Sequence, residues 1–185
     1  MRKGLLLLGL ITTITTFLAR PHKKRPPLPS GAITVYPGTD FEAQPGDLLF
    51  TPIGKSESKF VGHVGMVNHN QEVVHSIPSG LVTDSLKEYF QKFRLISVYS
   101  PIDKFAGVDA AHYLEALVEK HPTAQYRIFT PLDEEHHEQY CTKIVWQSYY
   151  YGAGINLGDF GGQAKGIHPE FLKDDRHLER KAKNL

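Results

Sequence analysis

The chain has 185 residues, of which 41% are hydrophobic and 22% are charged, enough for one compact core and little more. Its 21 basic and 20 acidic residues leave a formal net charge of +1, which gives no reason to expect a nucleic-acid partner. The single cysteine, Cys141, excludes an internal disulfide framework and any metal site built from several thiolates.

The N-terminus has the pattern of a targeting segment. Arg2 and Lys3 precede an uncharged, leucine-rich run from Gly4 to Leu18, after which basic residues return at once. This run is shorter than the roughly 20 residues that span a bilayer comfortably. A signal peptide and a short membrane anchor therefore remain alternatives for residues 1–19, and either one predicts an exported protein, membrane-anchored or secreted.

The next segment, residues 20–30, is basic and rich in proline, so it cannot form a helix and is expected to be a stiff linker. From residue 31 to residue 185 the chain alternates short β-like runs with helical patterns and contains no repeat. This pattern predicts one α+β domain.

The first half of the domain is predicted to be mainly strands. Pro45-Gly46-Asp47 is a turn that leads into a buried strand at Leu48 to Phe50. Two further strands, Gly62 to Val67 and Glu72 to Ile77, flank the polar residues Asn68 to Gln71 and should form a β-hairpin.

The second half is predicted to be richer in helix. Ser85 and Glu88 have the spacing of a capping box. The last clear helical pattern is a stripe at i, i+3, i+4, i+7 and i+8, formed by Cys141, Ile144, Val145, Ser148 and Tyr149. The expected elements are a helix at Leu86 to Phe93, a strand at Leu95 to Tyr99, a helix from a cap at Asp109 to Lys120, a helix from Cys141 to Gly152, a loop at residues 158–166, and a solvated helix from Lys173 to Leu185.

Cys141 falls in the first turn of that final helix. Unpaired backbone N–H groups and the positive end of the helix dipole favour the thiolate there, so its pKa is expected to be lowered. The same N–H groups lie where an oxyanion forms during attack on a carbonyl. This position suits a nucleophile that still needs a base.

The predicted hairpin supplies two histidines. His63 and His75 have the same parity about residue 69, the expected centre of the turn, so they should lie directly opposite one another on one sheet face. His75 could then fix the tautomer of His63 through a hydrogen bond. The other ring nitrogen of His63 would face the sulfur of Cys141.

Residue types alone leave three readings of these side chains open. The histidines could be a satisfied surface pair, and Cys141 could be a small buried apolar residue. One thiolate and two imidazoles could also bind zinc, using Cys141, His63 and His75. Catalysis, zinc binding and packing are comparable explanations at this level.

Several strings in the sequence resemble a known family. Residues 44–50 (QPGDLLF), 62–67 (GHVGMV) and 73–76 (VVHS) resemble the histidine-bearing half of NlpC-type papain-like cell-wall hydrolases. In ordinary members the cysteine helix precedes this half, whereas here residues 139–146 (QYCTKIVW) follow it. This order resembles the circularly permuted branch, the YiiX/YebB-like and YycO-like hydrolases, over residues 44–152.

The resemblance implies a circularly permuted papain-like fold in which an antiparallel sheet packs against helices. It implies Cys141 as nucleophile, His63 as base, His75 as third polar residue, and Tyr126 as an active-site tyrosine that helps to stabilise the oxyanion. Several permuted members have glutamate where this chain has His75. The implied reaction is hydrolysis of an amide or ester bond through a thiolate acyl-enzyme, without a cofactor, on cell-wall peptide or another substrate of the bacterial cell envelope.

Two alternatives accompany this interpretation. The same Cys/His site would support an acyltransferase or a lipid-directed hydrolase acting on an amino-acyl or lipid-linked substrate. The fold could also serve as a non-catalytic or zinc-binding envelope module, with the N-terminus providing membrane association.

Overall fold

The computed structural model describes residues 34–52, 62–134 and 137–185. The predicted targeting segment and linker lie outside these residues. Among the residues described, none of the helices has the length and apolar character needed to cross a bilayer.

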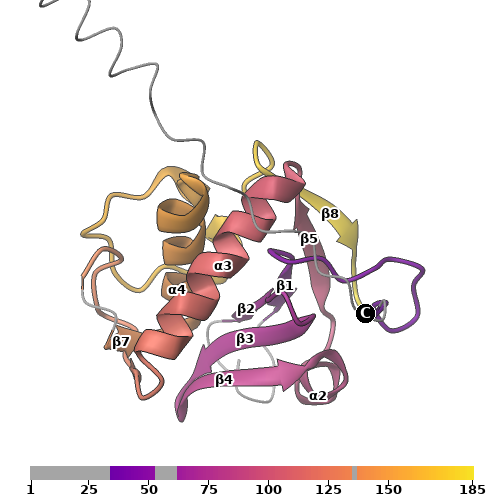
Figure 1. Cartoon of the computed structure of the whole chain (residues 1–185), viewed down its shortest axis with the longest axis horizontal. Coiled ribbons are helices and arrows are strands. Elements are labelled where there is room, and N and C mark those ends of the chain that lie inside the picture. Colours follow the sequence, from indigo (N-terminus) through magenta and orange to yellow (C-terminus); the bar gives the residue numbers. More distant parts are fainter. Residues whose placement is uncertain (1–33, 53–61, 135–136) are drawn as a thin grey trace, which may run out of the picture.

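A six-stranded sheet organises the molecule (Figure 1). All neighbouring strands are antiparallel, in the order β4-β3-β2-β1-β5-β8. Its strands are β1 (Leu48–Thr51), β2 (His63–Val67), β3 (Glu72–Ile77), β4 (Gly80–Ser85), β5 (Ser97–Pro101) and β8 (Leu178–Ala182). The predicted α+β class, with an antiparallel sheet packed against helices, is confirmed.

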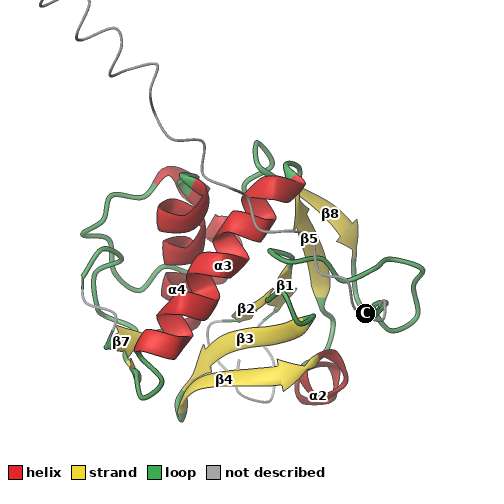
Figure 2. Ribbon diagram, in the orientation of Figure 1, coloured by secondary structure: helices red, strands yellow, loops and turns green. Residues whose placement is uncertain are grey.

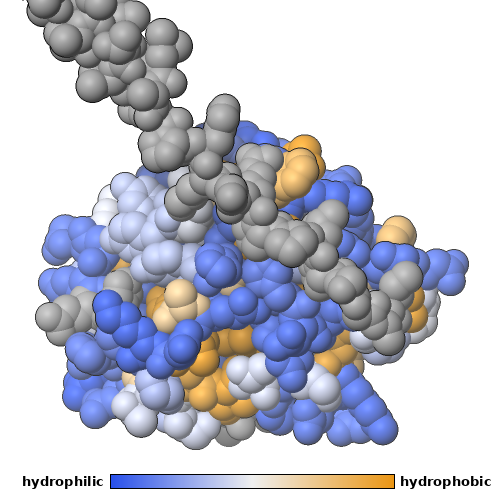
Figure 3. Space-filling view, in the orientation of Figure 1, coloured by the Kyte–Doolittle hydropathy of each residue, from blue (hydrophilic) through white to orange (hydrophobic). Residues whose placement is uncertain are grey.

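Helices cover both faces of the sheet (Figure 2). One face packs against α3 (Lys104–Lys120) and α4 (Cys141–Gln147), which continues into a π-helical segment, η1 (Ser148–Ala153). The other face packs against α2 (Leu86–Lys92). Residues alternate along β1, so Leu48 and Phe50 enter the first core and Leu49 enters the second. In Figure 3 the side that bears α3 is largely hydrophilic, with an apolar area between α3 and β3.

The predicted hairpin is present, but its register differs from the expected one. Met66 pairs with Val74 and Val67 with Val73, and the N–H of Asn68 donates to the carbonyl of Glu72. The loop therefore has three residues centred on residue 70, closed by Gln71 at a φ of 61°. As a result His63 and His75 are diagonal neighbours on one face, and the prediction that they lie directly opposite is wrong.

Element boundaries were predicted unevenly. The capping box at Ser85 and Glu88 is confirmed, with the Ser85 side chain accepting from the N–H of Glu88. The long helix begins five residues before the predicted cap, because the Asp103 side chain accepts from the N–H of Phe105 and caps it there.

The C-terminal tail was predicted to be a solvated helix, and this is wrong. It forms β8, an edge strand that pairs with β5. Leu178 is buried and Leu185 exchanges two backbone hydrogen bonds with Ile96, while the charged side chains between them are partly or fully exposed.

Candidate active site

Cys141 is the first residue of α4 and is almost fully buried. Its Sγ lies 3.8 Å from Oγ1 of Thr142. Burial raises the pKa of the thiol, while hydrogen bonds from the Thr142 hydroxyl and from the backbone N–H groups of Val64, Thr142 and Cys141 itself oppose this rise. The helix-end donors are present as expected, but burial outweighs them, so the expectation of a lowered thiol pKa is wrong.

His63 begins β2 and is held between two groups. Its Nε2 lies 2.9 Å from Nδ1 of His75, and its ring stacks on Phe93 at a centroid distance of 4.6 Å. Burial and the neighbouring His75 lower the pKa of His63 to about 3. The imidazole is therefore neutral at physiological pH, and the resting site holds a thiol and an imidazole instead of an ion pair.

The hydrogen-bond chain extends beyond the two histidines. Nε2 of His75 lies 2.9 Å from Oδ2 of Asp84, and Nζ of Lys92 lies 2.6 and 2.8 Å from the two Asp84 oxygens. Burial raises the pKa of Asp84, but hydrogen bonds from Lys92 and His75 outweigh it, and the pKa is lowered. Asp84 is thus an ionised acceptor beneath His75.

This chain determines the tautomers of both rings. A carboxylate only accepts, so His75 must carry its proton on Nε2, and its Nδ1 becomes an acceptor. His63 must then donate from Nε2, which leaves Nδ1 of His63 as the unprotonated nitrogen. An imidazole with one unprotonated nitrogen has the form that a general base requires.

Three of the four predicted site residues line one pocket, of about 40 Å³. They are Cys141, His63 and Tyr126. His75 lies behind His63, fully buried. Among the described residues the sulfur and the His63 ring are not hydrogen-bonded to one another, as is common for catalytic pairs before substrate binds. The remaining lining residues are Gly62, Ser76, Ile77, Pro78, Ile128, Tyr140, Thr142, Gly166, Ile167 and Pro169.

Tyr126 reaches this pocket through a small second sheet. β6 (Gln125–Tyr126) pairs in parallel with β7 (Glu138–Gln139), and β7 leads directly into α4. The pairing of Tyr126 with Gln139 therefore fixes the tyrosine two residues from the cysteine along the partner strand.

The alternative of a zinc site finds no support in this geometry. The facing nitrogens of His63 and His75 share a hydrogen bond, and the outer nitrogen of His75 is occupied by Asp84. In residues 34–52, 62–134 and 137–185, no group of three His, Cys, Asp or Glu side chains is placed to hold a metal ion.

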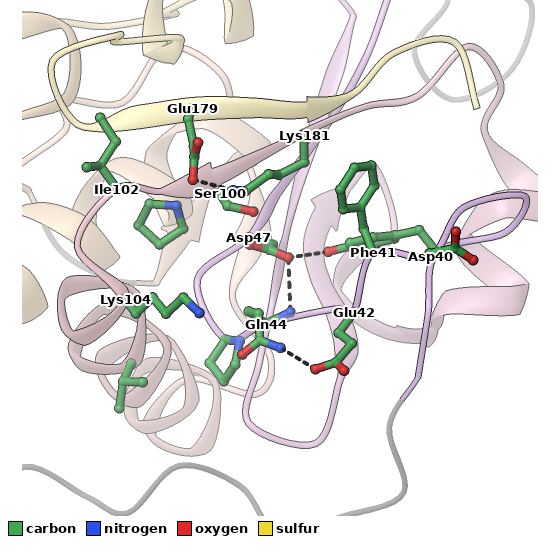
Figure 4. Close-up of a pocket in the computed structure, with 14 residues that line it drawn as sticks. Asp40, Phe41, Glu42, Gln44, Asp47, Ser100, Ile102, Lys104, Glu179 and Lys181 are labelled. Atoms are coloured by element: carbon green, nitrogen blue, oxygen red, sulfur yellow. Dashed lines mark hydrogen bonds and ion pairs between the residues drawn. The ribbon is translucent and has the colours of Figure 1, made fainter.

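A wider pocket, of about 300 Å³, lies at the other end of the sheet (Figure 4). At its floor Asp47 accepts from the hydroxyl of Tyr36 at 2.6 Å and from the N–H of Gln44 at 3.0 Å. Burial raises the pKa of Asp47 to about 6, against opposing hydrogen bonds that include one from Ser100. No histidine or cysteine lines this pocket, and its carboxylate holds the turn that precedes β1.

Asp84 and Lys92 are the site residues that the sequence analysis missed. Both depend on β4, which was not predicted. The signal was present, because a turn at Pro78 to Gly80 is followed by residues 81–84, LVTD, in which every second side chain faces the same way. A third hairpin strand would have placed Asp84 on the face that carries His75.

Comparisons with known proteins were made against families, curated proteins and solved structures. The family model described as lipoprotein N-acylation protein, LnsA-like, matches residues 10–177, which is most of the chain. The sequence matches no curated protein. A crystal structure of the protein yiiX from Escherichia coli O157:H7, described as a metalloprotein, superposes with a TM-score of 0.57 at 18% identity, over 76% of this chain and 97% of that one. At this identity the match establishes a shared fold.

Proposed function

Because the chain belongs to the family of LnsA-like lipoprotein N-acylation proteins, we propose that it is a cysteine acyltransferase that moves an acyl group from a lipid-linked donor to an amine. The observation that carries the proposal is the shared pocket of Cys141 and His63, with His63 oriented through His75 and Asp84. This choice takes the acyl-transfer alternative ahead of peptide hydrolysis.

In the first step the Sγ of Cys141 attacks the ester carbonyl of the donor, and Nδ1 of His63 takes the thiol proton. The carbon–oxygen bond breaks, the alcohol leaves with that proton, and a thioester remains on Cys141. In this proposal the backbone N–H groups at the start of α4 and Tyr126 at the pocket wall stabilise the oxyanion.

In the second step an amine attacks the thioester carbonyl. The carbon–sulfur bond breaks, His63 accepts a proton from the amine and returns it to the sulfur, and the amide product leaves. Water in place of the amine would give hydrolysis. The lining includes the apolar side chains of Ile77, Ile128 and Ile167, which suit an acyl chain.

The test uses the full-length protein, phospholipid vesicles and a synthetic diacylated lipopeptide with a free N-terminal amine. Mass spectrometry should detect an acyl adduct on Cys141 and a lipopeptide heavier by one acyl group. The Cys141→Ala and His63→Ala variants should give neither product, and an N-acetylated lipopeptide should accept nothing.

The same experiment separates the alternatives. Release of free fatty acid without acylated lipopeptide would favour a lipid hydrolase. In a parallel incubation with cell-wall peptide fragments, Cys141-dependent cleavage without a fatty-acyl adduct would favour an amidase. The absence of any Cys141-dependent product from either substrate would overturn the proposal of an enzyme.

The proposed reaction also places the protein at the envelope membrane, where lipid-linked acyl donors are located. The uncharged run at residues 4–18 is consistent with that position.

A further inference from the structure

Two phenylalanines stand out on the surface of the described residues. Phe129 is 80% exposed and Phe171 is 65% exposed, the two highest values among the large hydrophobic side chains described. Exposing a phenyl ring to water is unfavourable, and two such rings near one site indicate a surface with an apolar partner.

Both rings come from segments that contribute residues to the lining of the pocket that holds Cys141. Phe129 follows Ile128, which lines the pocket, and its ring packs beside Gly166, where an added Cβ would lie 3.3 Å from it. Phe171 belongs to the short 3₁₀ helix η3 (Pro169–Leu172), whose first residue also lines the pocket. The two rings therefore come from separate loops that border the same opening.

We propose that Phe129 and Phe171 form a docking surface that inserts into the lipid bilayer and brings the pocket mouth to the acyl donor. This inference rests on the proposed function and names the physical state of its substrate, a lipid held in a membrane. The exposed Lys165 forms a β-bridge with Pro131, two residues after Phe129, and is suited to contact anionic headgroups.

The chain outside the described residues supports a bilayer as the occupant. Residues 1–33 precede the described domain and contain the uncharged run at residues 4–18. From residue 19 to residue 33 an extended chain reaches about 50 Å, longer than a small domain is wide. A tether of this length permits the domain to turn the phenylalanine surface toward the membrane.

Phe105 provides a matched control, since it is an exposed phenylalanine in the first turn of α3. Gly107 in the same turn packs against Gly46, just before β1, whereas His63 pairs with Thr51 at the other end of that strand. The length of β1 therefore separates Phe105 from the catalytic pocket by roughly 13 Å or more.

The first experiment measures insertion without relying on catalysis. Full-length Phe129→Trp, Phe171→Trp and Phe105→Trp variants are mixed with vesicles of phosphatidylglycerol and phosphatidylcholine, with and without brominated acyl chains. Quenching of the added tryptophan is expected at positions 129 and 171 and not at 105, above the background of the buried Trp146. Equal quenching at all three positions, or none at 129 and 171, would overturn the docking surface.

The second experiment compares two donors, a phospholipid in vesicles and a water-soluble short-chain thioester. Phe129→Ser with Phe171→Ser should lower the vesicle rate by roughly tenfold or more and leave the soluble rate unchanged, while Phe105→Ser changes neither. An unchanged rate with the vesicle donor would contradict the docking surface and leave the proposed function standing. If the wild-type protein transfers no acyl group from either donor, the proposed function is wrong. The quenching result still decides whether the two phenylalanine rings insert into the bilayer.

Discussion

Asp84→Asn is the substitution that tests the catalytic interpretation most directly. Asp84 is an anion that fixes the proton of His75 on Nε2, and its side chain is only 6% exposed. An asparagine has the same shape but presents either a carbonyl oxygen or an amide N–H to His75. If the N–H faces the ring, both histidines reverse their tautomers, and Nδ1 of His63 gains a proton that blocks its use as a base.

The size of the effect follows from the contact that is changed. A hydrogen bond to a charged group contributes about 1.5–3 kcal/mol, against about 0.5–1.5 kcal/mol for a neutral one. The difference of about 1.5 kcal/mol corresponds to roughly a tenfold lower rate, and reversal of the tautomers would add to it. Lys92, whose side chain is 41% exposed, loses its partner but remains in contact with water, so little folding stability is at stake there.

The assay is acyl transfer from vesicles at pH 7, with imidazole ¹⁵N chemical shifts recorded on the same samples. Asp84→Asn should lower the rate at least tenfold and shift the ¹⁵N signals of His75 and His63. Asp175→Asn, at an exposed position, serves as the charge-matched control and should change neither. An unchanged rate together with unchanged histidine tautomers in a folded Asp84→Asn protein would refute the reasoning.

Three further predictions concern the thiol, the sheet and the second pocket. Burial raises the pKa of Cys141 above its ordinary value of 9.0. The rate of its alkylation by iodoacetamide should therefore rise about tenfold per pH unit from pH 7 to 9. A rate that has already reached a plateau below pH 7 would contradict a neutral resting thiol. Gly65→Ala should lower the free energy of unfolding, measured in urea, by about 1–3 kcal/mol. The new Cβ would lie 2.5 Å from Cγ1 of Val73 and 3.0 Å from Cε2 of the buried Tyr89. Gly161→Ala has open space around it and serves as the control, which should change the unfolding free energy little. A raised Asp47 pKa means that the folded state binds the proton more tightly than the unfolded state, so this group's contribution is complete below pH 3.8 and is lost as pH rises through about 6. The unfolding free energy of Asp47→Asn relative to the wild type should accordingly increase by roughly 2–3 kcal/mol between pH 4 and pH 7, and a constant difference would count against the raised pKa.

The sequence predicted the elements that follow simple periodicities. The buried stripe from Cys141 to Tyr149 and the strands on either side of residues 68–71 repeat at helical and β spacing, and all of these elements form. The exact register of the hairpin escaped prediction. It depends on Asn68, whose Oδ1 accepts from the N–H groups of Asn70 and Glu72, and on the left-handed backbone of Gln71.

The missed parts of the site share a different cause. Asp84 becomes relevant only when β4 pairs with β3, which the local pattern at residues 78–84 does indicate. Its contact with Lys92 also requires that α2 fold back over the sheet, and no local pattern encodes that contact. The raised pKa of Cys141 also depends on tertiary packing, because it comes from burial. The helix end by itself would lower the pKa. Local spacing thus singled out Cys141 and His63, which line one pocket, while their protonation states are set by contacts between distant segments.

The size of the pocket adds a requirement to the proposed mechanism. A pocket of about 40 Å³ is far smaller than the roughly 300–1,000 Å³ of sites that hold drug-sized ligands, so an acyl chain enters only if part of the wall moves. His63, His75, Asp84 and Cys141 lie on strands and a helix that pack into the two cores, and their movement would break the hydrogen-bond chain that sets the base. The walls at residues 127–128 and 166–168 lie outside the regular strands and helices, and their side chains are partly exposed. We expect the pocket to open at these two segments, which adjoin Phe129 and the helix η3 that carries Phe171, so contact of these rings with a bilayer would both dock the domain and admit the chain.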